Sequence, residues 1–319
     1  MLSENVFCRE RIIMLGTLLF ALIALNSDIS FSSPCPECFV LLYPDRDSSS
    51  GFTDYRCGNL SYDGHTGTDF AVADEAKMRS GVTVRAAAPG RVLRIRDGVP
   101  DRKVSDLNQV KGQECGNGLV IDHGRGWESQ YCHLRQNSVT VRPGQQVDRG
   151  TPVGLVGQSG AASFPHVHFE VRHQGKTIDP NGGIPLNNSC STNKTALWQQ
   201  PIAYIPTALI HSGFSPQVPT MAEVEAGKWH NYQIKATDPS LIFWTRSYGV
   251  KAGDRVTMTM VNPDREQVVD YKNTLTKDNR IFFIYTGSRK VVPGTWTVTF
   301  QLDRGNQKLI DISQTILVK

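Results

Sequence analysis

The sequence has no apolar run long enough to cross a membrane. The longest, from Ile12 to Leu25, has about 14 residues, whereas a transmembrane helix needs roughly 20. Two arginines precede this run and small residues follow it, as in a secretory signal peptide. We therefore expect a signal peptide at residues 1–32, cut between Asn26 and Ser33, and no stable membrane span after its removal. An uncleaved N-terminal anchor is the alternative.

A strong charge of either sign is also missing. The formal net charge is +4 over 319 residues, a mild excess that does not indicate a nucleic-acid partner. A dinucleotide fingerprint is absent too, because the glycines in Gly154-x-x-Gly157-x-x-Gly160 have the wrong spacing and no strand–helix unit follows them. We interpret the glycine repeat as a tight turn.

Helical periodicity is scarce. Between Cys57 and Pro180, short apolar runs alternate with Gly, Pro, Asn and Asp turn signals, and no helical period persists for more than a turn or two. This pattern predicts short strands in a sheet or sandwich and argues against strand–helix–strand units. The expected strands are Thr83–Ala88, Arg91–Ile95, Gly118–Asp122, Gln130–His133, Thr151–Val156 and Val167–Arg172.

Cysteines are few, but their number fits export. Of the seven, Cys8 belongs to the signal peptide, and the remaining six can form up to three disulfides. We expect Cys115 and Cys132 to pair first, because they bracket a strand-and-turn stretch whose ends a hairpin would bring together. Cys35 and Cys38 form Cys-x-x-Cys without the strand–helix context of a redox motif, so a structural disulfide is expected. A zinc knuckle is the minor alternative.

The C-terminal part contains no cysteine and no cluster of metal ligands. It follows a linker, residues 186–208, that is rich in Asn, Ser, Thr and Pro. Apolar and polar residues alternate through Val256–Met260, and about seven strands over residues 209–319 would fit an immunoglobulin-like β-sandwich. The expected strands are Asn231–Ala236, Leu241–Trp244, Arg255–Val261, Arg280–Tyr285, Gly294–Leu302 and Ile310–Leu317.

One stretch, Pro165–Val171, alternates histidine with large apolar residues. In a strand, His166 and His168 would project from the same face. Such a pair alone is more often a surface feature than a metal site, but His65, Asp69 and His133 lie upstream. A catalytic zinc typically takes three His or Asp/Glu ligands and keeps one position open. The five groups could therefore supply three ligands and leave two histidines for chemistry.

These segments resemble the catalytic domain of the M23 (lysostaphin/LytM-type) zinc metalloendopeptidases, which cut peptides in bacterial peptidoglycan. The resemblance covers somewhat more than a third of the chain, and a terminal Asp-Pro at residues 179–180 also fits it. Four motifs carry it in the same order: His-x-x-x-Asp at His65–Asp69, Gly-x-Val-Ile-Asp-His-Gly at Gly118–Gly124, Tyr-x-His-Leu at Tyr131–Leu134, and His-x-His-Phe-Glu at His166–Glu170.

The resemblance implies an all-β fold: an antiparallel-sheet LytM-like catalytic domain at residues 57–185, with a groove above the sheet, and the C-terminal immunoglobulin-like sandwich. A Cys-containing segment, residues 33–56, would precede the catalytic domain. By the same resemblance His65, Asp69 and His168 are the zinc ligands, holding one Zn²⁺ per chain. His133 and His166 match the catalytic histidines that are not ligands.

The function implied is a zinc-dependent endopeptidase that cleaves peptide cross-links of peptidoglycan by means of a metal-activated water. It would be exported to the periplasm or cell envelope of a Gram-negative bacterium, where the C-terminal domain would bind cell wall or a protein partner, or act as a spacer. One alternative is a non-catalytic LytM-like scaffold that activates another cell-wall hydrolase. Another is a binding module with incidental histidines.

The remaining polar features receive structural interpretations. His123 is expected to have a structural hydrogen-bonding role, and Glu170 to orient His168 from the same strand face. The polar stretch Arg96–Gly116 is expected to be either a wall of the groove or a mobile insertion. The other histidines have no partners at metal spacing and are expected at the surface: His173, His211 and His230.

Overall fold

The structure is a computed structural model that describes residues 29–104, 106–186, 190 and 196–319. Most of the expected signal peptide, residues 1–28, lies outside these ranges. Within them, no helix combines the length and apolarity needed to traverse a bilayer. The described helices are short: α1 Glu75–Arg79, the 3₁₀ turn η1 Leu107–Val110 and α2 Met221–Glu225.

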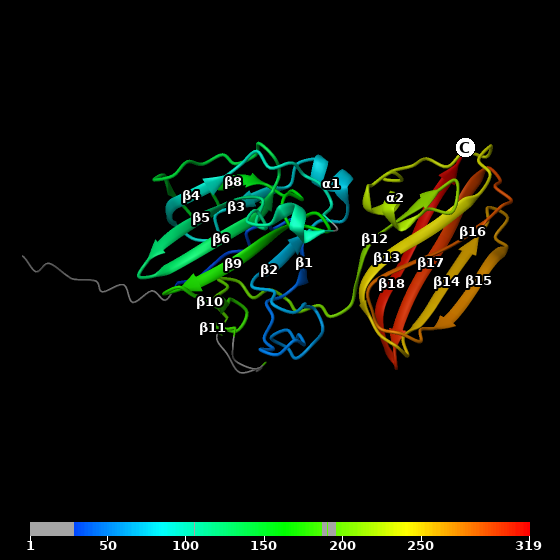
Figure 1. The fold of residues 1–319 in the computed structure, drawn as a ribbon. Coiled ribbons are helices and arrows are strands. Elements are labelled where there is room, and N and C mark those ends of the chain that lie inside the picture. The colour runs from blue at the N-terminus through cyan, green and yellow to red at the C-terminus, as the bar shows by residue number, and fades with distance from the viewer. Residues whose placement is uncertain (1–28, 105, 187–189, 191–195) are drawn as a thin grey trace, which may run out of the picture.

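The N-terminal domain is built on one nine-stranded antiparallel sheet (Figure 1). Its strands are β1 Phe39–Leu42, β2 Thr68–Ala71, β4 Gly90–Arg96, β5 Asn117–Gly124, β6 Trp127–Leu134, β7 Gln146–Val147, β9 His166–His173, β10 Lys176–Asp179 and β11 Ile184–Pro185. Their order is β1-β2-β9-β6-β5-β4-β7, and β10 and β11 extend from β9. A separate pair, β3 Thr83–Arg85 and β8 Pro152–Leu155, completes the domain.

One face of the large sheet covers the hydrophobic core. On β9, Val167, Phe169 and Val171 are fully buried in that core, so the alternate residues from His166 to Arg172 face the other way. An antiparallel sheet commonly buries one face and leaves the other for polar side chains. The all-β fold expected from the turn-punctuated sequence is confirmed, and the functional residues lie on the face away from the core.

Residues ahead of the family-like segment are part of this sheet. β1 is the edge strand of the sheet and pairs with β2. Phe31 is completely buried and packs edge-to-face against Phe169 at 5.9 Å. A backbone bridge joins Phe31 to Trp198, which follows the domain in sequence. The segment before β2 therefore closes the core from the N-terminal side.

Three disulfides reinforce the domain. The expected pair Cys115–Cys132 is present and links the start of β5 to β6. Cys35–Cys38 is a disulfide as expected, which leaves no free thiols there for a zinc knuckle. The third disulfide joins residues 57 and 190, far apart in sequence. All six cysteines that follow residue 28 are thus paired.

The C-terminal domain is a β-sandwich of seven strands (Figure 1). One sheet has the order β12-β13-β16 and the other β15-β14-β17-β18, and large apolar side chains from both fill the space between them. The strands are β12 Ala208–Ser215, β13 Leu241–Val250, β14 Arg255–Val261, β15 Gln267–Thr274, β16 Asn279–Ser288, β17 Gly294–Arg304 and β18 Gln307–Val318.

The sequence pattern misplaced one strand of this sandwich and missed two. Asn231–Ala236 was expected to be a strand, but residues 232–235 have no regular secondary structure, and Asn231 has a positive φ of 59°. Its alternation arises because Ile234 is buried in the sandwich core. β12 was missed because it contains small and polar residues, and β15 because it is an edge strand with mostly exposed side chains.

The two domains pack against each other along β1 and α1. Phe39 of β1 stacks on Tyr248 of β13, with ring centroids 6.0 Å apart. Asp74, at the N-terminus of α1, lies 3.4 Å from ring nitrogens of both His211 and His230. The expectation that His211 is a surface residue was wrong, because its side chain is only 14% exposed. The domain contact that buries it is invisible in the sequence.

Burial of Phe31 constrains the mature N-terminus. A cut after residue 32 would remove this side chain, and losing a buried phenylalanine costs about 3–5 kcal/mol. We therefore expect N-terminal sequencing of the exported protein to give a first residue no later than Ser30. Phe31→Ala should lower the free energy of unfolding by a similar amount, whereas Phe52→Ala, at a 41% exposed position, should have a much smaller effect. A stable mature protein that begins at Ser33 would contradict this expectation.

Candidate metal centre

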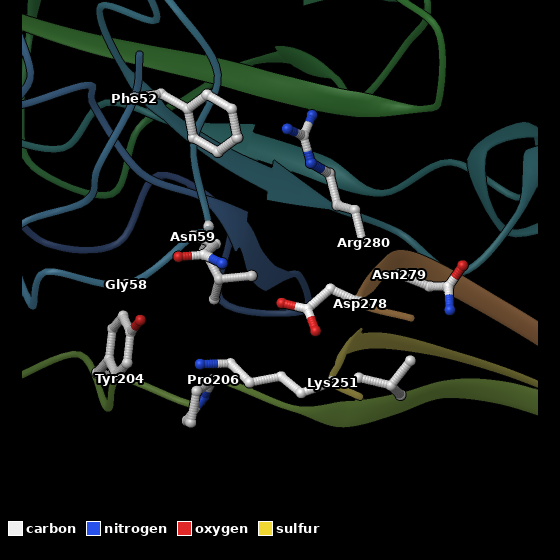
Figure 2. Close-up of a pocket in the computed structure, with 12 residues that line it drawn as sticks. Phe52, Gly58, Asn59, Tyr204, Pro206, Lys251, Asp278, Asn279 and Arg280 are labelled. Atoms are coloured by element: carbon white, nitrogen blue, oxygen red, sulfur yellow. The ribbon is translucent and has the colours of Figure 1, made fainter. Parts of the chain in front are cut away.

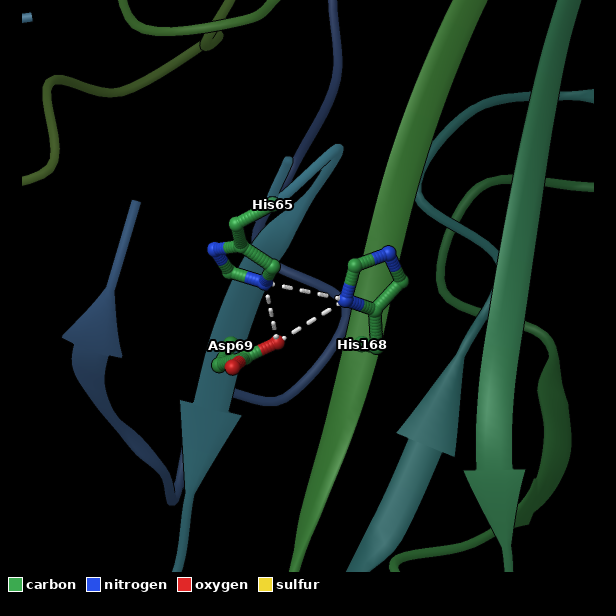
Figure 3. Close-up of side chains that lie close together, drawn as sticks. All are labelled: His65, Asp69 and His168. Atoms are coloured by element: carbon green, nitrogen blue, oxygen red, sulfur yellow. Dashed lines mark hydrogen bonds and ion pairs between the residues drawn. The ribbon is translucent and has the colours of Figure 1, made fainter. Parts of the chain in front are cut away.

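Three side chains converge on the polar face of the sheet, at β2 and β9 (Figure 3). Asp69 lies directly opposite His168 in the pairing of these strands, and His65 lies in the loop that enters β2. Asp69 Oδ1 is 2.9 Å from His168 Nδ1 and 3.1 Å from His65 Nε2, and the two nitrogens are 3.2 Å apart. The structure thus brings together the three residues expected to be metal ligands.

The outward nitrogen of each histidine has a partner that fixes the ring. His65 Nδ1 donates to the backbone carbonyl of Tyr43, 2.8 Å away, which leaves a lone pair on Nε2 facing Asp69. His168 Nε2 lies 3.4 Å from the hydroxyl of Thr66. That hydroxyl donates to Glu170 at 3.0 Å. Glu170, expected to orient His168, thus reaches it through Thr66.

A glycine in the His65–Asp69 motif permits this close approach. A Cβ atom at Gly67 would lie 2.5 Å from His168 Nε2 and 2.7 Å from the carbonyl oxygen of Phe169. Neither atom can move easily, because β9 is a central strand of the sheet. The spacing His-x-x-x-Asp therefore needs a residue without a side chain in its middle position.

The electrostatics of the cluster suit a cation. Burial alone would raise the pKa of Asp69, but His65, His166 and the hydrogen bond from His168 hold it well below its usual value. Burial opposes charging of His168, yet the hydrogen bond to Asp69 outweighs it and the pKa of His168 is raised. The three facing atoms all carry lone pairs, so a shared proton or a metal ion must lie between them. Two imidazoles and one carboxylate are a typical zinc donor set.

His133 and His166 stand beside this cluster, with ring centroids 4.7 Å apart. His133 Nδ1 lies 2.8 Å from the carbonyl of Ser159, and His166 Nδ1 lies 2.8 Å from that of Phe164. Each Nδ1–H therefore donates to backbone, and each Nε2 is left with a lone pair. Burial lowers the pKa of both, and that of His133 falls well below its usual value. Both imidazoles are neutral near pH 7.

The backbone at His133 is held in an unusual conformation. Its φ is +61°, a value that non-glycine residues adopt mainly where the surroundings enforce it. The adjacent Cys132 is tied to Cys115 by the disulfide, and the N–H of His133 donates to the carbonyl of Cys115 at 2.8 Å. The disulfide predicted from sequence thus lies where it can fix the direction of the His133 side chain.

Two aromatic residues complete the cluster and were not expected from sequence. Tyr62 stacks on His65 with centroids 4.4 Å apart, and Phe164 stacks on His166 at 4.3 Å. Burial raises the pKa of Tyr62 and Asp69 raises it further, while the positive charge of Arg280 opposes both. An aromatic two or three residues before each histidine is a weak signal, because no motif spacing marks it.

Other features expected from the sequence lie outside the cluster. His123 has the structural role expected: Nδ1 lies 2.6 Å from the carbonyl of Pro89 and Nε2 2.8 Å from the Ser129 hydroxyl. His173 stacks on Trp127 at the far end of β9. The described part of the stretch 96–116 is tied to the turn before His166, since the N–H groups of residues 102 and 104 donate to the carbonyls of residues 158 and 162. Of the glycine repeat expected to be a tight turn, Gly154 lies in β8 and Gly157 bridges to His166, so only Gly160 lies in this turn.

Comparison with known proteins adds an independent finding. Residues 63–180 match the family model of peptidase family M23. The peptidoglycan DD-endopeptidase ShyB of Vibrio cholerae is 31% identical over 131 residues, which are 41% of this chain and 26% of ShyB. ShyA of the same organism, also a peptidoglycan DD-endopeptidase, is 30% identical over 133 residues, with 41% and 26% covered.

A third relative has a different named role. The murein hydrolase activator EnvC of Escherichia coli is 35% identical over 100 residues, which are 31% of this chain and 20% of EnvC. The chain thus spans about a quarter or less of the length of these relatives. The family-model match at residues 63–180 includes the histidine and aspartate cluster.

Metal binding should compete with protons at this cluster. The pKa of His168 is raised above its usual 6.5. As the pH is lowered, we therefore expect Zn²⁺ affinity to begin to fall before pH 6.5 is reached. Below the pKa of His168, affinity should fall roughly tenfold per pH unit for each proton displaced. Titration calorimetry in buffers of different ionisation enthalpy would measure the proton release. Asp69→Asn should remove most of the affinity, whereas the exposed neighbour Asp63→Asn should not. Affinity that stays constant from pH 8 to pH 5.5 would contradict this account.

Proposed function

Residues 63–180 are a domain of peptidase family M23, and from this premise we propose that the chain is a zinc-dependent endopeptidase that cleaves peptide cross-links of bacterial peptidoglycan. The observation that carries the proposal is the arrangement of five groups in one place. His65, Asp69 and His168 offer three converging donor atoms. His133 and His166 lie beside them, each with Nδ1 on a backbone carbonyl and a lone pair left on Nε2.

The three converging residues would hold one zinc ion per chain. When bound there, zinc would act as a Lewis acid on a peptide carbonyl and lower the pKa of a water molecule towards about 7. The chain's own contribution is to keep His65 and His168 in the right tautomer, through the Tyr43 carbonyl and the Thr66 hydroxyl. The Asp69 carboxylate supplies the negative charge that keeps a cation in a buried place.

His133 and His166 are proposed to handle protons. In their tautomer each Nε2 can accept a proton from the attacking water. Once protonated, the same atom can donate a hydrogen bond to an oxygen that becomes negative, or give the proton to the leaving amine. His166 Nε2 lies 3.5 Å from Asp69 Oδ1, and the positive charge that it gains would be stabilised by that carboxylate.

The alternative is a scaffold that activates another cell-wall hydrolase, and the similarity to EnvC keeps it open. The intact donor set favours the enzyme, because a scaffold has no need for three buried metal-competent groups or for two further buried histidines beside them. Measurement of zinc content and peptide release separates the two functions.

The proposed substrate is a peptide cross-link of the type D-alanine to diaminopimelate, and the proposed location is the periplasm or cell envelope of a Gram-negative bacterium. Support comes from relatives named peptidoglycan DD-endopeptidases and from the apolar N-terminal run followed by three disulfides. Disulfides persist mainly in oxidising compartments such as the periplasm.

Substitutions should separate metal binding from chemistry. His168→Ala should lose both zinc and cleavage. His133→Ala and His166→Ala should keep zinc but release cross-linked peptides from purified peptidoglycan about 10²–10⁴ times more slowly, the usual contribution of a general acid or base. Zinc content and peptide release would be measured on the same preparations, with His173→Ala on the same strand as the matched control.

Two outcomes would count against the proposal. If His133→Ala and His166→Ala cleave at the rate of the wild type, these residues are not catalytic. If the zinc-loaded wild type releases no peptide but stimulates a second hydrolase, the scaffold function replaces the peptidase. A change in His173→Ala as large as in the other variants would indicate a general loss of structure.

A further inference from the structure

A cavity of about 180 Å³ lies where the two domains meet (Figure 2). Phe52 and residues 58–60 line it from the N-terminal domain, Tyr204 and Pro206 from the connecting segment, and residues 249–251 and 278–280 from the sandwich. The cavity therefore exists only when both domains are present. The sandwich contributes its positively charged side chains.

Arg280 and Lys251 are the cations of this cavity. Arg280 extends from the start of β16 across the opening toward Phe52, and its guanidinium lies 5.4 Å from the centroid of that ring (Figure 2). Within the described residues, no ion pair joins either cation to a carboxylate. Asp278 also lines the cavity, where it accepts a hydrogen bond from the N–H of Ala252. The cavity thus presents an excess of positive charge to solvent.

The chain leads from this cavity to the metal centre. Leu60 lines the cavity and accepts a hydrogen bond from the N–H of Tyr43 at 2.8 Å, and Tyr62 follows Leu60 by two residues. Tyr62 in turn stacks on His65, one of the three converging residues. Tyr62 is 42% exposed, so a ligand can reach its ring beside the metal centre. A ligand that lies across Tyr62 would reach both places.

We propose that this cavity is a substrate subsite, in which Arg280 of the C-terminal domain binds a free carboxylate of a peptidoglycan stem peptide. The proposal rests on the proposed function and gives the sandwich a part in the same reaction. Stem peptides carry several free carboxylates beside the cross-link. A guanidinium forms paired hydrogen bonds with a carboxylate, and the ring of Phe52 holds the plane of Arg280 in place.

Apolar packing and a hydrogen bond join the two domains that form this cavity. Ile281, next to Arg280, packs on a buried cluster that includes Leu41 and Leu60 of the N-terminal domain. On the other side of the contact, Arg246 Nη1 donates to the Ala73 carbonyl at 3.0 Å. Arg280 is therefore anchored to the sheet domain that holds the metal centre.

The test measures binding, so that it does not depend on cleavage. The probe is the uncross-linked tetrapeptide stem of Gram-negative peptidoglycan, compared with the same peptide in which each carboxylate is a carboxamide. Titration calorimetry on the full-length zinc-loaded protein gives the ratio of the two dissociation constants. We expect the wild type to prefer the free acid by roughly tenfold, the scale of a hydrogen-bonded ion pair. Arg280→Ala should lose most of this preference, and Arg280→Lys should keep part of it.

Arg289→Ala is the matched control, since residue 289 follows the opposite end of β16 and is also exposed. It changes net charge by the same amount and should keep the wild-type ratio. An unchanged ratio in Arg280→Ala, equal loss in Arg289→Ala, or no binding of the free acid by the wild type would each overturn the proposal. Carboxylate-dependent binding without cleavage would support the subsite and count against the peptidase function alone.

Discussion

The pairing of β2 with β9 is the constraint on which the metal centre depends. Asp69 and His168 are directly opposite in that pairing, and a slip of β2 by one residue would turn Asp69 into the apolar core, away from His168. The register is kept because Phe70, Val167 and Phe169 fill the core from the opposite face. The alternation of apolar and polar residues along β2 and β9 therefore packs the core on one face of the sheet and places the metal-competent side chains on the other. A buried carboxylate between two imidazoles is stable only with a proton or a cation beside it.

Backbone carbonyls set the tautomer of three histidines at the site. His65, His133 and His166 each donate from Nδ1 to a carbonyl, and the acceptors come from the segment after β1 and from the loop between β8 and β9. Tautomers chosen in this way leave every Nε2 as a lone-pair donor or a base. The segment before β2 is essential here, because it supplies the acceptor for His65. The disulfide beside His133 has a similar part, since it fixes a strained backbone.

The sequence predicted those features that depend on local patterns of residues. Alternation in β9 predicted which histidines share a face, and a hairpin pattern predicted the disulfide between Cys115 and Cys132, both of which the structure contains. Features that depend on contacts between distant segments were not predictable. The stacking of Tyr62 on His65 and the burial of His211 at the domain contact have no periodic signature. Strand β15 was not predicted, because an exposed edge strand needs no alternation of apolar residues.

The central claim is that two imidazoles and one carboxylate hold a zinc ion on the polar face of this sheet. X-ray absorption at the zinc edge, on protein loaded with one equivalent of the metal, tests it most directly. We expect nitrogen and oxygen neighbours only, at roughly 2.0–2.1 Å, with the scattering pattern of two imidazoles, and we expect His168→Ala to retain no zinc after the same loading. Sulfur at roughly 2.3 Å would place the metal at cysteines instead and contradict the account.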